Sequence, residues 1–397
     1  MLVYFIASIV SFYLILRAFI KIKYHFWSRQ PVFHIYDLHH WVRCNKVIDH
    51  ELPSMNEYVD IINIKTVSIE EMSENDISCF CSFIKNHYLR TKNAEYIPEK
   101  QHIIEYMKSS NHTSYVSIHR HRNQYNSINL LNTNEELKEN DICSVITSRI
   151  LHITFKSTKP IPLYYIDNLC VHPAMRKKKI APKAIQTLHY NLRRMNEDVK
   201  TFLFKREGEM TAIVPLTTFE VRGFTTSMIP RLELPHASMT VIEITPNNLM
   251  LFVELIKGQG ETYECVVVPE ITNLMNTIKE GLISLYGILE HGKLIAVYVF
   301  RDAATFYDGE RALELISSIS VCHFHEIFYA GFTQALHSCC KKWNTSILTV
   351  DGVGGNEIIT KSIGQHNNIP LFTSKSAFFL YNYASYTLPP DKCFLLC

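Results

Sequence analysis

Apolar residues recur at helical spacing in several segments of the chain, and runs of β-branched and aromatic residues separate them. The helical spacing predicts helices over residues 68–90, 99–109, 178–194, 246–257, 270–281 and 325–341. The β-branched and aromatic runs predict strands over residues 144–155, 163–171, 284–290, 293–300, 346–350 and 377–383. After residue 235 the order of elements resembles a second pass of the same pattern. Because strands and helices mix in both halves without regular alternation, the pattern predicts an α+β architecture.

The first twenty residues are apolar, with no charge before Arg17. A bilayer span needs about 20 residues, and residues 1–20 reach this length if the Arg17 side chain extends to the headgroups. Lys21 and Lys23 follow the apolar run and no basic residue precedes it. The positive-inside rule therefore predicts an uncleaved, single-pass membrane anchor with residues 21 onward in the cytosol. The alternative is a buried amphiphilic helix.

Composition narrows the class of protein further. The 397 residues include 47% apolar and 20% charged residues, which is the ordinary globular range and excludes a disordered chain. Forty basic and thirty-eight acidic residues leave a net charge of +2, so we expect no nucleic acid partner. The compact, divergent sequence with its N-terminal anchor suggests a protein of a large DNA virus, acting in the infected host cell.

The eleven cysteines favour a reducing compartment and give little support for a metal site. No CxxC pair occurs, which removes the usual signal for a zinc ribbon. The patch Cys322-His323-Phe324-His325 could recruit a metal, but such residues more often belong to a core or a surface. We therefore expect no metal, and in the cytosol the sequons at Asn111 and Asn344 would stay unglycosylated.

Candidate chemistry lies where the predicted strand 163–171 leads towards the helix that follows. Four consecutive cations, Arg176 to Lys179, come just before that helix, which should begin near Lys179 because Pro182 is tolerated only in a first turn. A helix N-terminus with added cations can hold a pyrophosphate, and the small Ala181 would let a phosphate approach the backbone. The alternative is a solvated basic loop.

Four sequence motifs, in order along the chain, resemble one acyltransferase family. Arg176, Lys179 and Ala181 fit the R/Q-x-x-G-x-G/A loop of the GNAT acyltransferases. The longer stretch NLCVHPAMRKKKIAP from Asn168 is similar to that of the eukaryotic and viral N-myristoyltransferases, the glycylpeptide N-tetradecanoyltransferases. The other three motifs are YHFWSRQPV at 24–32, LP at 52–53, and FLYNY at 379–383 followed by the terminal KCFLLC. The resemblance therefore extends over residues 24–397.

The resemblance implies a duplicated GNAT fold whose two halves bind different substrates. It implies a transmembrane anchor (1–20), an arm against acyl-CoA (21–60), an acyl-CoA-binding half (61–235) and a peptide-binding half (236–397). Myristoyl-CoA would be a co-substrate, with no cofactor, and the partners would be proteins with an N-terminal glycine. The implied peptide-binding residues are Tyr88, Tyr96 and Phe219. The implied acyl-CoA-binding residues are Tyr24, His25, Phe26, Trp27, Leu169, Cys170, Val171, Arg176, Lys177, Lys178, Lys179, Ile180 and Ala181.

The mechanism that the resemblance implies relies on two kinds of main-chain group, the backbone N–H groups and the terminal carboxylate. The glycine amine attacks the thioester directly, and backbone N–H groups at Asn168 and Leu169 form the oxyanion hole. The base is the terminal carboxylate, here that of Cys397, and the apolar residues 394–396 would be threaded inwards. The alternative for this segment is an ordinary C-terminal strand.

The sequence departs from the family at several peptide-side positions. Arg90, Thr91 and Lys92 replace an acidic stretch, no hydroxyl occurs in residues 204–206, and Val221 replaces a histidine, although Arg222 is kept. Asn168 replaces a phenylalanine, and residues 370–376 replace a glycine-rich turn. These departures leave open a catalytically silent acyl-CoA-binding membrane or structural protein of the same fold. An acetyl-transferring enzyme is a lesser alternative, because the 24–32 arm and the apolar terminus argue against it.

Overall fold

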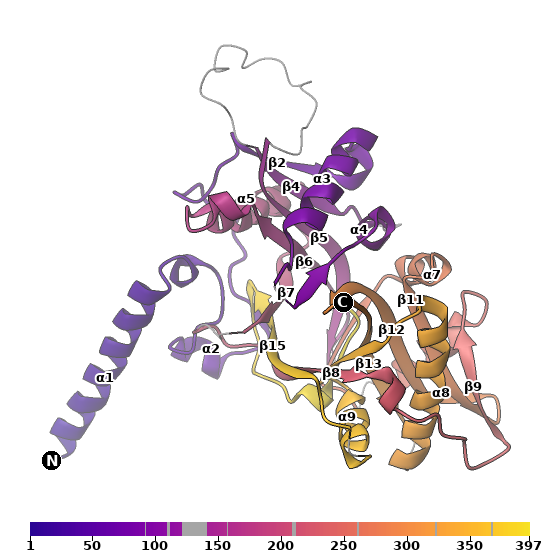
Figure 1. The fold of residues 1–397 in the computed structure, drawn as a ribbon. Coiled ribbons are helices and arrows are strands. Elements are labelled where there is room, and N and C mark those ends of the chain that lie inside the picture. The colour runs from indigo at the N-terminus through magenta and orange to yellow at the C-terminus, as the bar shows by residue number, and fades with distance from the viewer. Residues whose placement is uncertain are drawn as a thin grey trace.

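The computed structural model describes residues 1–397 except 92, 109–111, 121–140, 157, 209–211, 260–261, 322–323 and 367. The helices are α1 Leu2–Lys23, α2 Leu38–Val42, α3 Glu74–His87, α4 Lys100–Met107, α5 Ile180–Met195, α6 Leu249–Gly258, α7 Ile271–Lys279, α8 His325–Trp343 and α9 Asn356–Gln365 (Figure 1). The strands are β1 Lys46–Val47, β2 Ile64–Ser68, β3 Ala94–Tyr96, β4 Tyr115–Arg120, β5 Ile142–Phe155, β6 Ile161–Val171, β7 Thr201–Glu207, β8 Thr217–Thr225, β9 Met239–Ile244, β10 Cys265–Pro269, β11 Ile283–Glu290, β12 Lys293–Tyr307, β13 Glu310–Ser320, β14 Ile347–Asp351, β15 Phe372–Tyr381, β16 Tyr383–Ala384 and β17 Cys393–Leu395.

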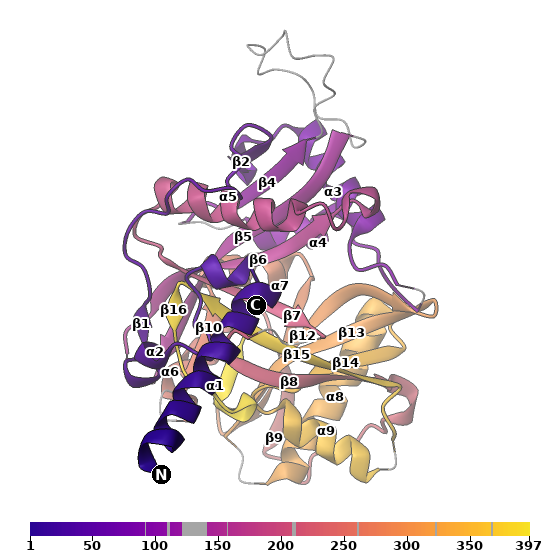
Figure 2. The ribbon, with the colours of Figure 1, turned by 90° about the vertical axis from the view of Figure 1, so that its left-hand side faces the viewer.

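One mixed sheet runs through the molecule and confirms the predicted α+β class. Its strands follow the order β17-β10-β5-β6-β7-β15-β8-β14-β13-β12-β11-β9, with β4 and then β2 added beside β5, and β3 added beside β12. Helices lie on both sides of this sheet (Figures 1 and 2). Helix α5 packs on β5 and its neighbours, and helix α8 packs on β11, β12 and β13. A separate two-stranded sheet pairs β1 with β16.

The same unit occurs twice in this sheet. In the first half, antiparallel strands β4, β5 and β6 lead through α5 to β7, which pairs parallel with β6. In the second half, antiparallel strands β11, β12 and β13 lead through α8 to β14, which pairs parallel with β13. Each half then lends a strand to the other, since β15 pairs with β7 and β8 pairs with β14. Strands β15 and β8 also pair with each other and so join the two units.

The two parallel strand pairs separate at equivalent points. Strand β6 stays paired with β7 up to Ile166 and Phe204, and β13 stays paired with β14 up to Leu315 and Val350. Immediately beyond these points the register shifts in both units, which places a β-bulge in β6 and another in β13. A gap therefore opens between the parallel strands of each unit, which we call the first and the second gap. Lys205 and Asp351 occupy equivalent positions at their edges.

Helix α5 begins where the sequence predicts. Its first residue is Ile180, with Lys179 at the N-cap, and Pro182 lies in the first turn. Ala184, Leu188 and Leu192 are buried against the sheet together with residues of β5 and β6. Burial of this apolar stripe fixes the helix over the first gap and directs its N-terminus towards it.

Helix α1 extends away from the body (Figures 1 and 2). It is the one helix of the described chain with the length and apolar composition to cross a membrane, a property that signal sequences and some helices of soluble proteins share. Among its residues only Ile20 is buried, which contradicts the alternative of a buried N-terminal helix. The second half of α1 contacts the body, because the Tyr13 hydroxyl donates to the Tyr36 carbonyl at 3.1 Å and Arg17 lies over the Tyr36 ring.

Candidate active site

The first gap is a pocket of about 400 Å³ between β6, β7 and the start of α5. This volume lies within the range of sites for small organic ligands. Its walls are predominantly apolar, with a few polar groups. The lining residues are Phe26, Trp27, Tyr88, Ile146, Ile166, Asp167, Asn168, Leu169, Ala181, Pro182, Ile185, Leu188, His189, Phe202, Phe204, Lys205, Arg206 and Tyr381.

The arm over residues 21–60 closes one side of this pocket. Trp27 stacks on Phe204 with ring centroids 5.7 Å apart and an interplanar angle of 12°. The buried Gln30 holds the arm in place, since its Oε1 accepts a hydrogen bond of 2.8 Å from the Tyr381 hydroxyl. The Asn382 N–H donates to the Pro31 carbonyl at 2.7 Å. The QPV and LYNY motifs, whose bonded residues are 351 positions apart in sequence, are therefore bonded to each other.

The far end of the arm is tied to helix α5. The Arg194 guanidinium donates to the Pro53 carbonyl at 2.8 Å, and the buried Arg193 donates to the His50 carbonyl at 3.1 Å. Lys183 forms an ion pair of 3.0 Å with Asp60. The arm thus spans from the pocket mouth to the back of α5 and is held at both ends.

The bulge in β6 forms the floor of the pocket. Asn168 has a left-handed backbone with φ of 50°, a strained conformation that turns the peptide groups around it out of the ladder. The Asn168 N–H, a predicted oxyanion donor, is bonded to the Asp167 side chain, with 2.7 Å between its nitrogen and Oδ1. Its side-chain amide donates to Thr147 Oγ1 at 3.1 Å. Asp167 must therefore turn away before this N–H can bind a ligand oxygen.

The basic loop lies at the N-terminal end of α5. Lys177 and Lys179 both have left-handed backbones, with φ of 63° and 60°, on either side of Lys178. Left-handed residues in a turn can direct successive N–H groups to one side, as in the anion-binding concavities of other proteins. The four side chains of residues 176–179 are exposed, and within the described chain none forms an ion pair with a carboxylate. Lysines that have a strained backbone and no carboxylate partner are more typical of a phosphate-binding site than of a simple surface turn.

A buried network of charges connects the pocket to the end of the chain. Lys205, which lines the pocket, lies 2.7 Å from Asp351 Oδ2 and 3.9 Å from Glu314 Oε1. Arg301 binds Glu314 through Nε at 2.8 Å and Nη2 at 2.6 Å. The same guanidinium donates from Nη1 to the Cys397 carbonyl oxygen at 3.0 Å. Cys397 is buried, with 7% of its surface exposed.

Burial and charge act in opposite directions on these groups. Burial raises the pKa of Asp351 to about 6, and the neighbouring Glu314 adds to this rise while Lys205 opposes it. Burial alone would lower the pKa of Lys205, but Asp351 and Glu314 outweigh it, so the pKa is raised and the ammonium persists. For Glu314, burial is outweighed by Arg301 and Lys205, and its pKa is lowered. Asp351 Oδ1 is buried without a hydrogen-bond partner within the described chain.

A second, larger pocket of about 920 Å³ lies beside the first. Its lining includes Phe219, Arg222, Glu220 and the glycine-rich segment 352–355. Lys205 Nζ lies 5.5 Å from the centroid of the Phe219 ring. Because Lys205 lines the first pocket and Phe219 lines the second, these two side chains form a wall common to both.

The structure gathers part of the predicted site in the first pocket. Phe26, Trp27, Tyr88, Asn168, Leu169 and Ala181 line it. Tyr96 packs edge-on against Tyr88 at 5.8 Å, and Phe219 lines the neighbouring pocket.

Other predicted residues lie outside the pocket lining. Tyr24 is half-buried, and His25 Nδ1 lies 3.0 Å from the Tyr58 hydroxyl. Ile180 is buried at the start of α5, directly after the exposed Arg176, Lys177, Lys178 and Lys179. Val171 is half-buried at the end of β6. Cys170 is buried in a different cluster, among residues of α3 and α4, where burial raises the pKa of its thiol to about 12.

Cys397 follows β17, whose three residues pair parallel with β10. Residues 394–396 are buried, as expected of a terminal segment that is threaded inwards. Two of them also belong to the strand ladder, so the segment is at the same time an ordinary strand. Four predicted positions, Cys322, His323, Lys92 and Asn111, lie outside the described residues.

Sequence reasoning did not find the buried charges. Arg301, Glu314 and Asp351 each interrupt an apolar strand, in VFRDA, LELIS and LTVDG. Charges inside or at the end of such an apolar run are the signal that could have identified them, since a buried charge requires a partner.

No family model matches this chain, and no curated protein sequence does. Solved structures do match. A crystal structure of Saccharomyces cerevisiae N-myristoyltransferase with bound myristoyl-CoA superposes with a TM-score of 0.68 and 13% identity, over 93% of this chain and 90% of that chain. A second structure of the yeast enzyme with bound myristoyl-CoA gives 0.67 and 14%, over 92% and 94%. A third, with myristoyl-CoA and inhibitors, gives 0.66 and 14%, over 92% of both chains.

The chain therefore has the N-myristoyltransferase fold, a duplicated GNAT-like acyltransferase fold. This confirms the fold expected from the four motifs. The matched enzymes come from yeast, so they carry no support for a viral origin.

Proposed function

We propose that this protein is a glycylpeptide N-tetradecanoyltransferase-like enzyme, which transfers myristoyl from myristoyl-CoA to the N-terminal glycine of proteins. The arrangement of the two adjoining pockets carries this proposal. The first pocket joins an apolar chamber to a strained bulge and to a cationic helix N-terminus, as the acyl chain, thioester and phosphates of an acyl-CoA require. The second pocket begins across the wall formed by Lys205 and Phe219, where an acceptor peptide would lie. In this division the arm 21–60 and the half 61–235 hold the donor, and the half 236–397 supplies most of the acceptor side.

Transfer begins with attack of the neutral glycine amine on the thioester carbonyl carbon. The N–C bond forms as negative charge collects on the carbonyl oxygen, and the C–S bond then breaks to release CoA thiolate. The N–H groups of Asn168 and Leu169 would bind the developing oxyanion, each such donor contributing roughly 10²–10³ in rate. Binding of the thioester would have to displace Asp167 Oδ1 from the Asn168 N–H.

The attacking amine must first lose a proton, and the buried network offers two carboxylate bases. The terminal carboxylate of Cys397, oriented by Arg301, is the first, and it requires that Cys397 be the last residue of the mature protein. Asp351 is the second, because a carboxyl with a pKa raised to about 6 is well matched to proton transfer near neutral pH. With all groups ionised, the three cations Lys205, Arg301 and Arg149 lie near the three carboxylates of Asp351, Glu314 and the chain terminus, so the charges of the network balance.

The charges around the second pocket argue against a strong preference for basic peptides. Its charged lining residues are three basic and three acidic: Arg222, Lys361, Lys375, Glu220, Glu357 and Asp391. Arg222 is paired with both Glu220 at 2.7 Å and Glu357 at 3.3 Å. The acceptor peptides of this enzyme would therefore be selected by the glycine and by shape more than by positive charge.

Membrane attachment through residues 1–20 is the proposed setting of this reaction, with the catalytic body in the cytosol. The apolar exposed surface of α1 and the basic Lys21 and Lys23 at its end support it. A protein lacking residues 1–20 should appear in the soluble fraction while the full chain sediments with membranes. Equal sedimentation of both would remove this part of the proposal.

A catalytically silent acyl-CoA-binding membrane or structural protein is the second candidate. The bond from the Asn168 N–H to Asp167 favours it, since this bond occupies a predicted oxyanion donor. The absence of a hydroxyl in residues 204–206, near which the family has a threonine, favours it as well. In the silent protein the second pocket would serve as a docking surface.

One experiment separates the two candidates. The full-length protein is incubated with radiolabelled myristoyl-CoA and glycine-initiated peptides of varied charge, and both binding and transfer are measured. Transfer to glycine peptides but not to their alanine-initiated counterparts establishes the enzyme. Binding of myristoyl-CoA without transfer to any peptide establishes the silent protein. A variant with one residue added after Cys397 tests the terminal carboxylate, while Asp351→Asn tests the second base. The base is the carboxylate whose change lowers kcat and leaves myristoyl-CoA affinity intact.

A further inference from the structure

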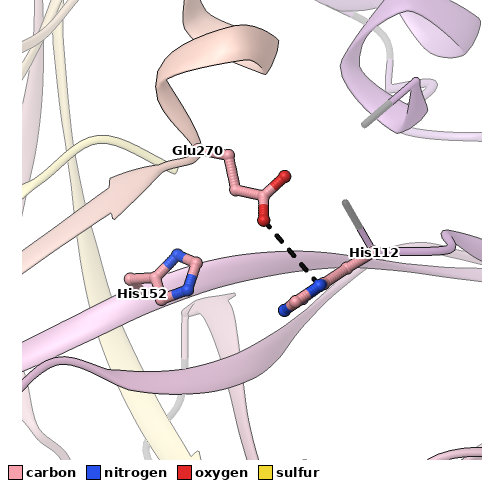
Figure 3. Close-up of side chains that lie close together, drawn as sticks. All are labelled: His112, His152 and Glu270. Carbon is pink, nitrogen blue, oxygen red and sulfur yellow. Dashed lines mark ion pairs between the residues drawn. The ribbon is translucent and has the colours of Figure 1, made fainter. Parts of the chain in front are cut away.

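Three side chains that could bind a metal converge far from the two pockets, at the junction of the two halves. His152 lies on β5, Glu270 lies between β10 and α7, and His112 lies just before β4 (Figure 3). One ligand atom from each residue lies within 4.8 Å of the other two. Within the described part of the chain, this is the one group of three or more His, Cys, Asp or Glu side chains close enough to hold a metal ion.

Each of the three residues is held by regular structure. His152 is paired in the sheet with Val268 on one side and Pro162 on the other, so its backbone is fixed. Glu270 is the N-cap residue of α7, yet its side chain makes no capping bond to that helix. The carboxylate instead points towards the two histidines, and Oε1 lies 3.8 Å from His112 Nδ1 (Figure 3). Only 8% of the Glu270 side chain is exposed, compared with 33% for His112.

We propose that His112, His152 and Glu270 form a Zn²⁺ site that ties the first half of the molecule to the second. Two imidazoles and one carboxylate are a recurrent zinc ligand set, with a water or a further ligand in the fourth position. Ligand atoms in such a site lie roughly 3.3 Å apart, given metal–ligand distances near 2.0–2.2 Å. The three ligand atoms lie within 4.8 Å of one another, so metal binding would have to draw them closer by up to about 1.5 Å.

The position of the site makes the metal structural. His152 is six residues along β5 from Ile146, which lines the first pocket, so about 20 Å of strand separates them. The metal would join β5 and the chain before β4, both in the first half, to α7 in the second. The same junction already has one side-chain tie, because Asn273 of α7 donates to the Lys108 carbonyl at 2.6 Å. Zinc binding at this point stabilises the docking of α7, and none of the three residues lines either pocket.

The test uses the full chain, freed of metal with a chelator and titrated with ZnCl₂ by calorimetry, with melting temperature as a second measurement. We expect one Zn²⁺ per chain and a rise in melting temperature of roughly 5 °C. His112→Gln and Glu270→Gln should each weaken binding roughly tenfold or more. His337→Gln serves as the matched control, because His337 contacts the Ile229 carbonyl and lies on a different element.

Co²⁺ identifies the ligands, since this chain has eleven cysteines that could also bind metal. A site of two histidines and a carboxylate gives visible absorption bands without the intense near-ultraviolet bands of cobalt–thiolate bonds. Failure of the wild-type protein to bind zinc would overturn the proposal. Equal binding by wild type, His112→Gln and Glu270→Gln would overturn it as well, and so would a thiolate spectrum at one equivalent of Co²⁺.

Discussion

The first and second gaps have the same strand topology and opposite contents. In the first gap the space beyond the bulge of β6 is open and forms a pocket. In the second gap the chain folds back after β14 and fills the space beyond the bulge of β13. Asn356 does most of this, since its side-chain amide donates to the carbonyls of Leu315, Ile316 and Asp351 at 3.2, 3.2 and 2.7 Å. The same separation of strands thus leaves a pocket inside the first gap, whereas the second gap is filled and the larger pocket lies beside the filling segment, at Gly352, Gly354 and Gly355.

The second gap shows how the backbone groups of two separated strands find new hydrogen-bond partners. Carbonyl groups that leave a sheet ladder need another partner, and the two N–H groups of the Asn356 amide are shared among three carbonyls here. The segment can enter because Gly354 and Gly355 precede Asn356. A Cβ at Gly354 would lie 2.8 Å from the Ser318 carbonyl oxygen, and a Cβ at Gly355 would lie 2.9 Å from its hydroxyl. In the first gap the Asn168 N–H is bonded instead to the side chain of its neighbour Asp167, and the space beyond the bulge forms the pocket.

The two units also differ in their charged residues, and removal of the Arg301 charge should have the largest effect on stability. Arg301 and Arg149 occupy equivalent positions, but Arg301 binds Glu314 while Arg149 lies over the rings of Tyr106 and Tyr165. Arg301→Met leaves the buried Glu314 without its main partner, and we expect the free energy of unfolding to fall by about 3–5 kcal/mol. Arg149→Met should cost about 1–2 kcal/mol. Urea unfolding of both variants measures the difference, and equal losses would contradict this account of the asymmetry.

The next largest effect should come from the residue that fills the second gap. Asn356→Ala removes the two N–H donors that three carbonyls share at a fully buried position, and we expect a loss of about 2–4 kcal/mol in the free energy of unfolding. Asn168→Ala, in the open gap, should cost about 1 kcal/mol or less, because that side chain makes one bond at a half-buried position. Urea denaturation checks both. If Asn168→Ala proved the more damaging variant, the contrast between filled and open gaps would be wrong.

Lys205 and Asp351, the equivalent residues of the two units, form an ion pair, and the raised pKa of Asp351 predicts that the stability of the protein depends on pH. The folded protein holds a proton on Asp351 up to about pH 6, whereas the unfolded chain loses it near pH 4. The folded state therefore binds more protons in this window, and the contribution of Asp351 to stability falls as pH rises from 4 to 6. Asp351→Asn removes this slope. The stability of the variant relative to wild type should increase by about 1–3 kcal/mol between pH 4 and pH 7, as measured by urea unfolding at each pH. A constant difference would show that Asp351 titrates normally.

The smallest expected effect concerns the cations of the open gap. Lys177→Ala and Lys179→Ala should each weaken CoA binding by about 1 kcal/mol, and the loss should shrink at high salt. Lys177→Gly and Lys179→Gly lose the same charge but relieve the left-handed backbone, so they should bind CoA as weakly while unfolding at higher urea concentration. Lys257→Ala, at an exposed position on α6, is the control. Calorimetry at two salt concentrations measures the affinities, and salt-independent losses would argue against a phosphate cradle.

The features of the site that could be predicted from sequence are the local ones. The start of α5 followed from the position of Pro182, and the exposed basic loop before it from four adjacent cations, because both depend on neighbouring residues. The arm was recognisable by its motif, although its attachment to β15 through Gln30 was not. Strands β7, β8 and β13 were not predicted, and neither was α9. Their register depends on partners in the other half of the chain, which no local pattern contains.

The sequence by itself determined the duplicated order of elements, the apolar N-terminal helix and the residues at the mouth of the first pocket, because short-range spacing and backbone preferences specify them. The tertiary structure alone decided which gap stays open, since that depends on whether a distant segment returns to fill it. It also decided the partners of the buried charges, because Lys205, Arg301, Glu314, Asp351 and Cys397 come from five different strands or ends of strands. Burial makes each of these partners obligatory, and only the folded sheet brings them within reach of one another.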